Sequence, residues 1–137
     1  MSEIKVDSII GKTSAKTVTV TVGATATQSL EQGLAKIWCT WDMTETNVIK
    51  DSLAISSLTD DSTGINTLNF PPMGNAFYPV TACFHPDSVS SNTNVIRVRD
   101  LPTTTTVKMH TSASQIGSGN SSDDAPLAYT VIHGSLA

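Results

Sequence analysis

Alternation of apolar and polar side chains over residues 35–70 is the feature that most constrains the fold of this chain. The first run sets Ile37, Cys39 and Trp41 against Lys36, Trp38, Thr40 and Asp42, and the second sets Ile65, Thr67 and Asn69 against Asn66, Leu68 and Phe70. A period of two is typical of half-buried strands. The segment between the runs ends in turn formers, and Gly64 tolerates a positive φ angle. The pattern predicts strands over 35–42 and 48–58, a turn over 59–64, and a returning strand over 65–70.

The composition favours many short strands joined by polar loops. The chain contains 20 threonines and 17 serines, whereas only 15% of its 137 residues are charged, against about a quarter in an average soluble domain. Threonine is β-branched and fits a pleated surface, and serine suits turns. We therefore expect no long helix.

Four more β-prone runs follow residue 70, at 77–84, 95–99, 103–111 and 127–133. Pro79 cannot donate a ladder hydrogen bond, so the first of these runs is expected at a sheet edge or a bulge. The segments between them, 71–76, 86–94 and 112–125, are rich in turn residues and are predicted to be loops. Together the runs predict an all-β fold, an antiparallel β-sandwich of about seven strands over residues 35–137.

Residues 1–34 form a separate unit in the sequence. Val18, Val20 and Val22 alternate with threonines, Ile4 and Val6 belong to a weaker alternation, and residues 23–27 resemble a linker. Residues 28–35 are compatible with one or two helical turns or with a simple turn. A single strand or hairpin is marginal in water, so we expect an extended N-terminal β arm that packs on its own domain, on another copy, or on a partner.

Charge and hydropathy exclude some partners. The net charge is −4 with scattered basic residues, whereas phosphate binding needs clustered Lys and Arg. Neither a membrane span nor the apolar core of a signal peptide is found in the sequence, so we expect folding in a cytoplasm. Cys39 and Cys83 are then predicted to be two buried, reduced thiols, with a disulfide as the alternative.

The sequence contains no motif typical of catalysis or of a cofactor site. His85, His110 and His133 lack metal-ligand spacing, so a metal site would have to be assembled from distant residues or from three chains around an axis. The pairs 60–61 and 123–124 are acidic, but turn residues explain them better than calcium ligands do. No cofactor is expected.

Trp38 and Trp41 lie three residues apart on one predicted strand, and therefore on opposite faces. At most one of them is ordinary core. The other is expected to contact another chain, which we favour, or to stack on a sugar.

The chain resembles the tail-fibre-like structural proteins of tailed bacteriophages, especially those of marine and cyanobacterial phages. The similar blocks are 2–9, 32–38, 49–60 with Gly64, 68–70, Tyr78 and 95–99. Trp38 lies one place later than in the family pattern, and Cys39 and Trp41 replace a commoner Val and Phe. The segment after Thr103 matches least.

The resemblance implies a non-enzymatic, trimeric virion protein that is assembled in the host cytoplasm. Its assembly interface would comprise Ile4, Val6, Val18, Val20, Val22 and Trp38. Its receptor-facing loops would present Asn75, Ser88, Asn92, Ser118 and Asn120.

The implied partners are further copies of the chain, other virion proteins in the tail, adaptor or capsid, and a host surface glycan, without nucleic acid or membrane insertion. A capsid decoration or head-fibre protein that caps and stabilises the shell is the alternative. A glycan-degrading enzyme is disfavoured, because a glycosidase needs two converging carboxylates.

Overall fold

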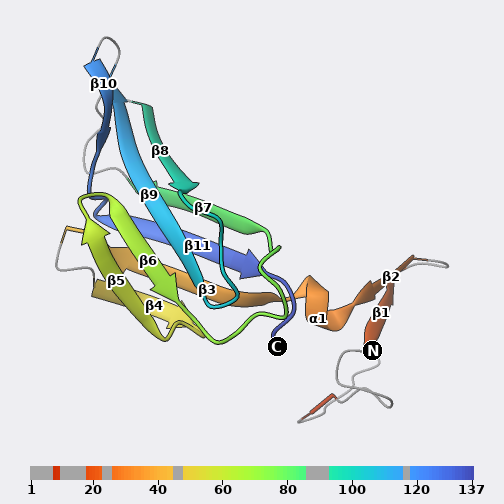
Figure 1. Cartoon of the computed structure of the whole chain (residues 1–137). Coiled ribbons are helices and arrows are strands. Elements are labelled where there is room, and N and C mark those ends of the chain that lie inside the picture. Colours follow the sequence, from red (N-terminus) through yellow and green to blue (C-terminus); the bar gives the residue numbers. More distant parts are fainter. Residues whose placement is uncertain (1–7, 10–17, 23–25, 45–47, 86–92, 116–117) are drawn as a thin grey trace. The chain divides into compact units, whose positions relative to one another are not determined.

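The structure of the chain is a computed structural model that describes residues 8–9, 18–22, 26–44, 48–85, 93–115 and 118–137 (Figure 1). The chain divides into two compact units, Met1–Leu34 and Ala35–Ala137. Ile4 and Val6 of the predicted assembly interface lie outside the described residues, as do Ser88 and Asn92 of the predicted receptor-facing loops.

The described part of the first unit is a β-hairpin followed by one helical turn. β1 (Thr19–Val22) pairs antiparallel with β2 (Ala26–Ser29), and α1 (Leu30–Gly33) follows directly. The Leu30 N–H donates to the Val18 carbonyl oxygen at 2.8 Å. The predicted linker over 23–27 is too long, because Ala26 and Thr27 already pair with the strand that precedes them.

The second unit is a sandwich of two antiparallel sheets, as the alternation predicts (Figure 1). One sheet has the order β4-β3-β11-β7 and the other the order β10-β9-β6-β5. β8 pairs with the edge of β9 that is opposite to the edge paired with β6 and β10. The strands of the first sheet are β3 (Ala35–Asp42), β4 (Val48–Leu53), β7 (Val80–His85) and β11 (Leu127–His133). Those of the second are β5 (Ser57–Ser62), β6 (Ile65–Asn69), β8 (Thr93–Val98), β9 (Thr106–Gln115) and β10 (Ser118–Ser122).

Two predicted segments differ from the structure. The single strand expected over 48–58 is two strands, β4 and β5, that belong to different sheets. Ala54 lies between them with a φ of 56°, a left-handed conformation that ends the ladder and turns the chain toward the other sheet. The turn expected over 59–64 is confined to Thr63 and Gly64, because β5 continues to Ser62 by pairing with β6.

The predicted loop over 112–125 is also wrong in its first part. β9 continues to Gln115, and β10 returns beside it with Ser122 opposite Ser112. Small polar residues carry weak strand propensity, but pairing with a neighbouring strand overrides propensity. Pro79, by contrast, behaves as predicted, since β7 is an edge strand and begins only at Val80.

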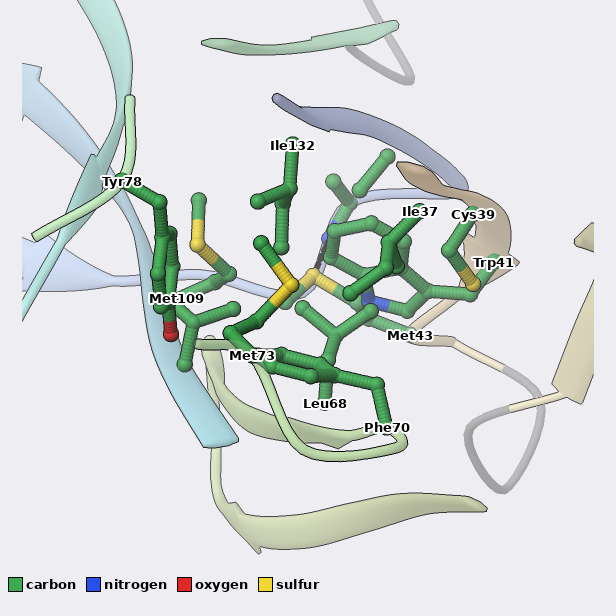
Figure 2. Packing of buried hydrophobic residues seen from close by; sticks show 13 residues of the cluster. Ile37, Cys39, Trp41, Met43, Leu68, Phe70, Met73, Tyr78, Met109 and Ile132 are labelled. Atoms are coloured by element: carbon green, nitrogen blue, oxygen red, sulfur yellow. Dashed lines mark hydrogen bonds between the residues drawn. The ribbon is translucent and has the colours of Figure 1, made fainter. Parts of the chain in front are cut away.

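The hydrophobic core lies between the inner faces of the two sheets (Figure 2). The strands contribute Ile37, Cys39, Trp41, Leu68, Val107, Met109, Ala128 and Ile132, and the loops contribute Met43, Phe70, Met73, Tyr78 and Ala125. Within each of these strands the core residues belong to one of the two alternating sets. Burial of such side chains, at about 25 cal/mol for each Å² of apolar surface, is what holds the two sheets together.

Candidate functional site

The outer face of the five-stranded sheet carries charged side chains from β5, β8 and β9. Because Val107 and Met109 point into the core, the alternation of β9 places Lys108 and His110 on the solvent side. The register then adds neighbours from the adjacent strands. We define the outer face by Thr59, Asp61, Thr67, Asn69, Arg97, Arg99, Lys108 and His110.

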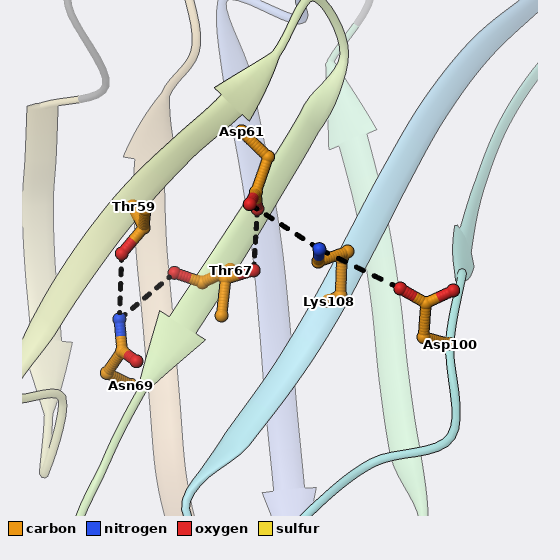
Figure 3. A network of polar contacts seen from close by, with 6 residues as sticks. All are labelled: Thr59, Asp61, Thr67, Asn69, Asp100 and Lys108. Atoms are coloured by element: carbon orange, nitrogen blue, oxygen red, sulfur yellow. Dashed lines mark hydrogen bonds and ion pairs between the residues drawn. The ribbon is translucent and has the colours of Figure 1, made fainter.

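One half of the outer face holds a single ammonium group between two carboxylates (Figure 3). The Lys108 ammonium lies 3.4 Å from an Asp61 oxygen and 3.8 Å from an Asp100 oxygen. The Thr67 hydroxyl donates to Asp61 at 2.6 Å, and the Asn69 amide donates to the Thr59 hydroxyl at 3.1 Å. These contacts join β5, β6 and β9 across the sheet, so the first role of this half is structural.

The other half of the outer face is basic. The Arg97 guanidinium donates to Nδ1 of His110, with Nε and Nη2 at 3.3 and 3.2 Å. Since Nδ1 accepts, Nε2 carries the proton and donates to the Ser122 hydroxyl at 2.9 Å. Burial, with Arg97 and Arg99 nearby, holds the pKa of His110 below its usual value. The imidazole is therefore neutral near pH 7, between two arginines.

The loop before β7 is firmly attached to the end of the sandwich. The N–H groups of Met73 and Gly74 donate to the Thr104 and Ser135 carbonyls, both at 2.7 Å. The Tyr78 hydroxyl donates to the Thr103 carbonyl at 2.8 Å, and burial raises the pKa of Tyr78 to about 12. Tyr78 also packs edge to face on Phe70, with ring centroids 5.9 Å apart.

This loop presents an apolar side chain that sequence reasoning missed. Phe77 is 96% exposed and Leu101, in the neighbouring loop, is 94% exposed. The Asn75 carboxamide oxygen accepts the Phe77 N–H at 2.8 Å. The alternation of residues 77–84 places Phe77 in a strand, whereas in the structure β7 begins at Val80. Tyr78 points into the core and Phe77 points into solvent.

The predicted receptor-facing residues do not form one group. Asn75 is exposed in the loop before β7, as expected, although its carboxamide oxygen is engaged with the backbone. Ser118 and Asn120 lie in strand β10 and not in a loop. Ser118 and Asn120 thus share one strand, to which Asn75 does not belong.

The predicted assembly residues are only partly described. Val18 is half-buried, and Val20 is 45% exposed; for Val22 the structure gives the strand but not the side-chain environment. Trp38 is half-buried on the outer side of β3, and Trp41 is fully buried in the core. The two tryptophans thus occupy opposite faces of one strand, as their spacing predicts.

The thiols and carboxylates have local roles. Cys39 and Cys83 are free cysteines, and Cys39 is buried but Cys83 is exposed, which corrects the prediction of two buried thiols. They lie on β3 and β7, strands that are separated by β11. Among the residues that the structure describes, no three His, Cys, Asp or Glu side chains are grouped to hold a metal ion.

The acidic pairs are not alike. Asp60 and Asp61 lie within β5 and not in a turn. Asp124, in the connection to β11, accepts the Gly64 N–H at 2.5 Å, so that pair has the structural role expected of turn residues.

No helix in the described parts of the chain is long and apolar enough to cross a membrane. Comparison of the chain with models of known protein families, with characterised proteins and with solved structures gives no match.

Proposed function

We propose that this chain is a non-enzymatic virion structural protein of a tailed bacteriophage. In this proposal it is a trimeric short tail or collar fibre, anchored by residues 1–34, and its β-sandwich is displayed for adhesion to the host surface. The observation that carries the proposal is Val20, which is 45% exposed on a sheet of only two strands. A two-stranded sheet is marginally stable in water, and burial of its valines against further copies would stabilise it.

The described carboxylates of the sandwich bind neighbouring side chains and backbone groups, which supports a structural role. Asp61 and Asp100 bind Lys108, Asp42 binds Thr44 and Lys50, and Asp124 binds the backbone of Gly64. A glycosidase would need two of these groups to converge on one bond. Their present use in holding strands and turns favours a scaffold that acts by surface contact.

The end of the sandwich that carries Phe77 and Leu101 supports the contact role. A contiguous exposed apolar patch marks a site of protein association, and Phe77 and Leu101 are large apolar side chains that would contribute to such a patch. The backbone bonds from Met73 and Gly74 hold this loop in place, so little conformational entropy is lost when a partner binds. We assign this end to contacts with other virion proteins or with the host surface.

The test of the trimer is a pair of charge substitutions on adjacent residues. The mass of the full chain, measured by light scattering, is expected to be three times 14.4 kDa. Val20→Asp should reduce it to that of one chain, because a carboxylate cannot be buried in an apolar contact. Thr21→Asp, which adds the same charge on the threonine side of β1, should remain trimeric. A wild-type chain that is monomeric at all concentrations would contradict the proposal.

The position on the particle is tested separately. Antibody or gold labelling of phage particles, followed by electron microscopy, should place the protein on the tail or collar. Label over the head shell would replace the fibre assignment with the capsid decoration alternative.

A further inference from the structure

The basic half of the outer face has a charge balance unlike that of the rest of the chain. The protein carries a net charge of −4, yet Arg97, Arg99 and His110 are gathered here on two neighbouring strands. Within the described part of the chain, the ion pairs on this face all involve Lys108, and neither arginine takes part in one. Two guanidinium groups without a described ion-pair partner favour a positive potential at this part of the surface.

The geometry also orders these groups in advance. Arg97 lies opposite His110 in the ladder, and the backbone N–H of Arg99 donates to the Lys108 carbonyl at 2.9 Å, so Arg99 continues the same row. His110 holds Arg97 through Nδ1 and is itself held by Ser122 through Nε2. A guanidinium with a fixed orientation loses less side-chain entropy when it binds an oxyanion than a free one does.

We propose that Arg97, Arg99 and His110 form a binding site for a single oxyanion, of the sulfate or carboxylate class. The anion accepts hydrogen bonds from Arg99 and from those N–H groups of Arg97 that do not point at His110. Its negative charge offsets the effect of the two arginines on His110, so that the imidazole more readily takes a proton from solvent.

The charged groups around His110 explain why anion binding would change its protonation. Arg97 faces it from β8, and Arg99 lies just after the end of that strand. Lys108 lies two residues away on β9, and Ser122 approaches from β10. The described carboxylates on this face, Asp61 and Asp100, are bound to Lys108. The described surroundings of His110 thus disfavour its protonated form, and a bound anion is the change that would favour it.

The first experiment follows the His110 imidazole by NMR as the pH is varied, with the full chain in sodium sulfate and in sodium chloride of equal ionic strength. We expect sulfate to raise the pKa of His110 saturably and to leave the resonances of His85, on the other sheet, unchanged. An identical His110 titration curve in the two salts would overturn the proposal. This result is independent of oligomeric state and of any virion.

The matched variants test the two arginines. Arg97→Gln and Arg99→Gln should each weaken sulfate binding about tenfold or more, which corresponds to the loss of one charge-assisted hydrogen bond. Lys36→Gln, which removes the same charge from β3 in the other sheet, should leave it unchanged. Equal weakening by all three variants would show a general charge effect and overturn the site. Unchanged Tm values would establish that the variants are folded.

Two polymers with the same backbone, one sulfated and one uncharged, distinguish a glycan ligand from a free anion. As a contact with a host glycan, the site rests on the proposed function. In that case immobilised dextran sulfate should retain the full chain, uncharged dextran should not, and Arg97→Gln should reduce retention. Binding of inorganic sulfate without retention on dextran sulfate would overturn the glycan assignment and leave a site for a free anion.

Discussion

The Nε1–H of Trp41 donates to the side-chain oxygen of Asn66 at 3.0 Å, and both residues are buried. Trp41 lies on β3 of the four-stranded sheet and Asn66 on β6 of the five-stranded sheet. The bond therefore crosses the core and connects the two layers through a polar pair. Because a buried polar group without a partner is costly, this contact selects one relative position of the two sheets.

Trp41→Phe is expected to lower the free energy of unfolding by about 2 to 4 kcal/mol, since it removes the donor to Asn66 and leaves a cavity. Urea denaturation followed by circular dichroism would measure the change. Trp38→Phe is the matched control on the same strand, and it should cost less than about 1 kcal/mol because Trp38 is half-buried on the outer side. Equal costs for the two variants would contradict the assignment of Trp41 to the core.

Gly64→Ala should destabilise the sandwich by about 2 kcal/mol or more. Gly64 has a φ of 69°, and a Cβ atom there would lie 2.6 Å from the Thr111 carbonyl oxygen and 2.8 Å from backbone atoms of Asp123. Both contacts are with backbone, which cannot move aside cheaply. A thermal melt would measure the loss.

Gly74→Ala provides the control for that substitution. The nearest contact of its added Cβ would be 3.4 Å, to the Ser135 carbonyl oxygen, so we expect a change within about 0.5 kcal/mol. A melting temperature for Gly64→Ala equal to that of Gly74→Ala would show that the β5–β6 turn does not contact the β10–β11 connection closely.

The two thiols should react at very different rates. Burial, with Asp51 as a second cause, raises the pKa of Cys39 to about 12, whereas Cys83 is exposed. A thiol must be accessible and ionised to react, so Ellman's reagent at about pH 8 should modify one thiol in the folded chain and two in denaturant. Cys83→Ser should abolish the fast reaction. A fast reaction of that variant would mean that β3 is not covered.

Asp42 is expected to make stability depend on pH at the acidic end. Its carboxylate accepts the Thr44 hydroxyl at 2.7 Å and the Thr44 N–H at 2.9 Å, and it lies 3.2 Å from the Lys50 ammonium. The Thr44 hydroxyl is the largest cause of a pKa for Asp42 below 3.8. The stabilisation is therefore full above the unfolded pKa and is lost as pH falls through the lower folded pKa.

The measurement is the difference in Tm between the wild type and Asp42→Asn. This difference should be constant from about pH 7 to pH 5 and should shrink below the unfolded pKa of the carboxyl group. Thr44→Ala, which removes the hydroxyl donor, should show a smaller difference with the same pH dependence. A Tm difference that grows as the pH falls would reverse the expected sign.

Periodicity determined most of the strand segments and which side chains share a face of each strand. Burial recurs at every second position from Ile37 to Trp41 in β3, from Val107 to Thr111 in β9 and from Ala128 to Ile132 in β11, because a pleated strand presents successive side chains to opposite faces. The position of β7 at an edge also follows from the sequence, since Pro79 has no N–H to donate. These properties are local, and each depends on a few consecutive residues.

Tertiary structure alone decided how the strands are paired and which side chains meet. The break at Ala54, the pairing of serine-rich β10 with β9, and the exposure of Phe77 depend on neighbours that are distant in the chain. Arg97, His110 and Ser122 come from three strands, so their meeting requires a particular register. Alternation indicates the face on which a side chain lies but not which residue of another strand lies beside it, because every register that differs by two residues preserves the same faces.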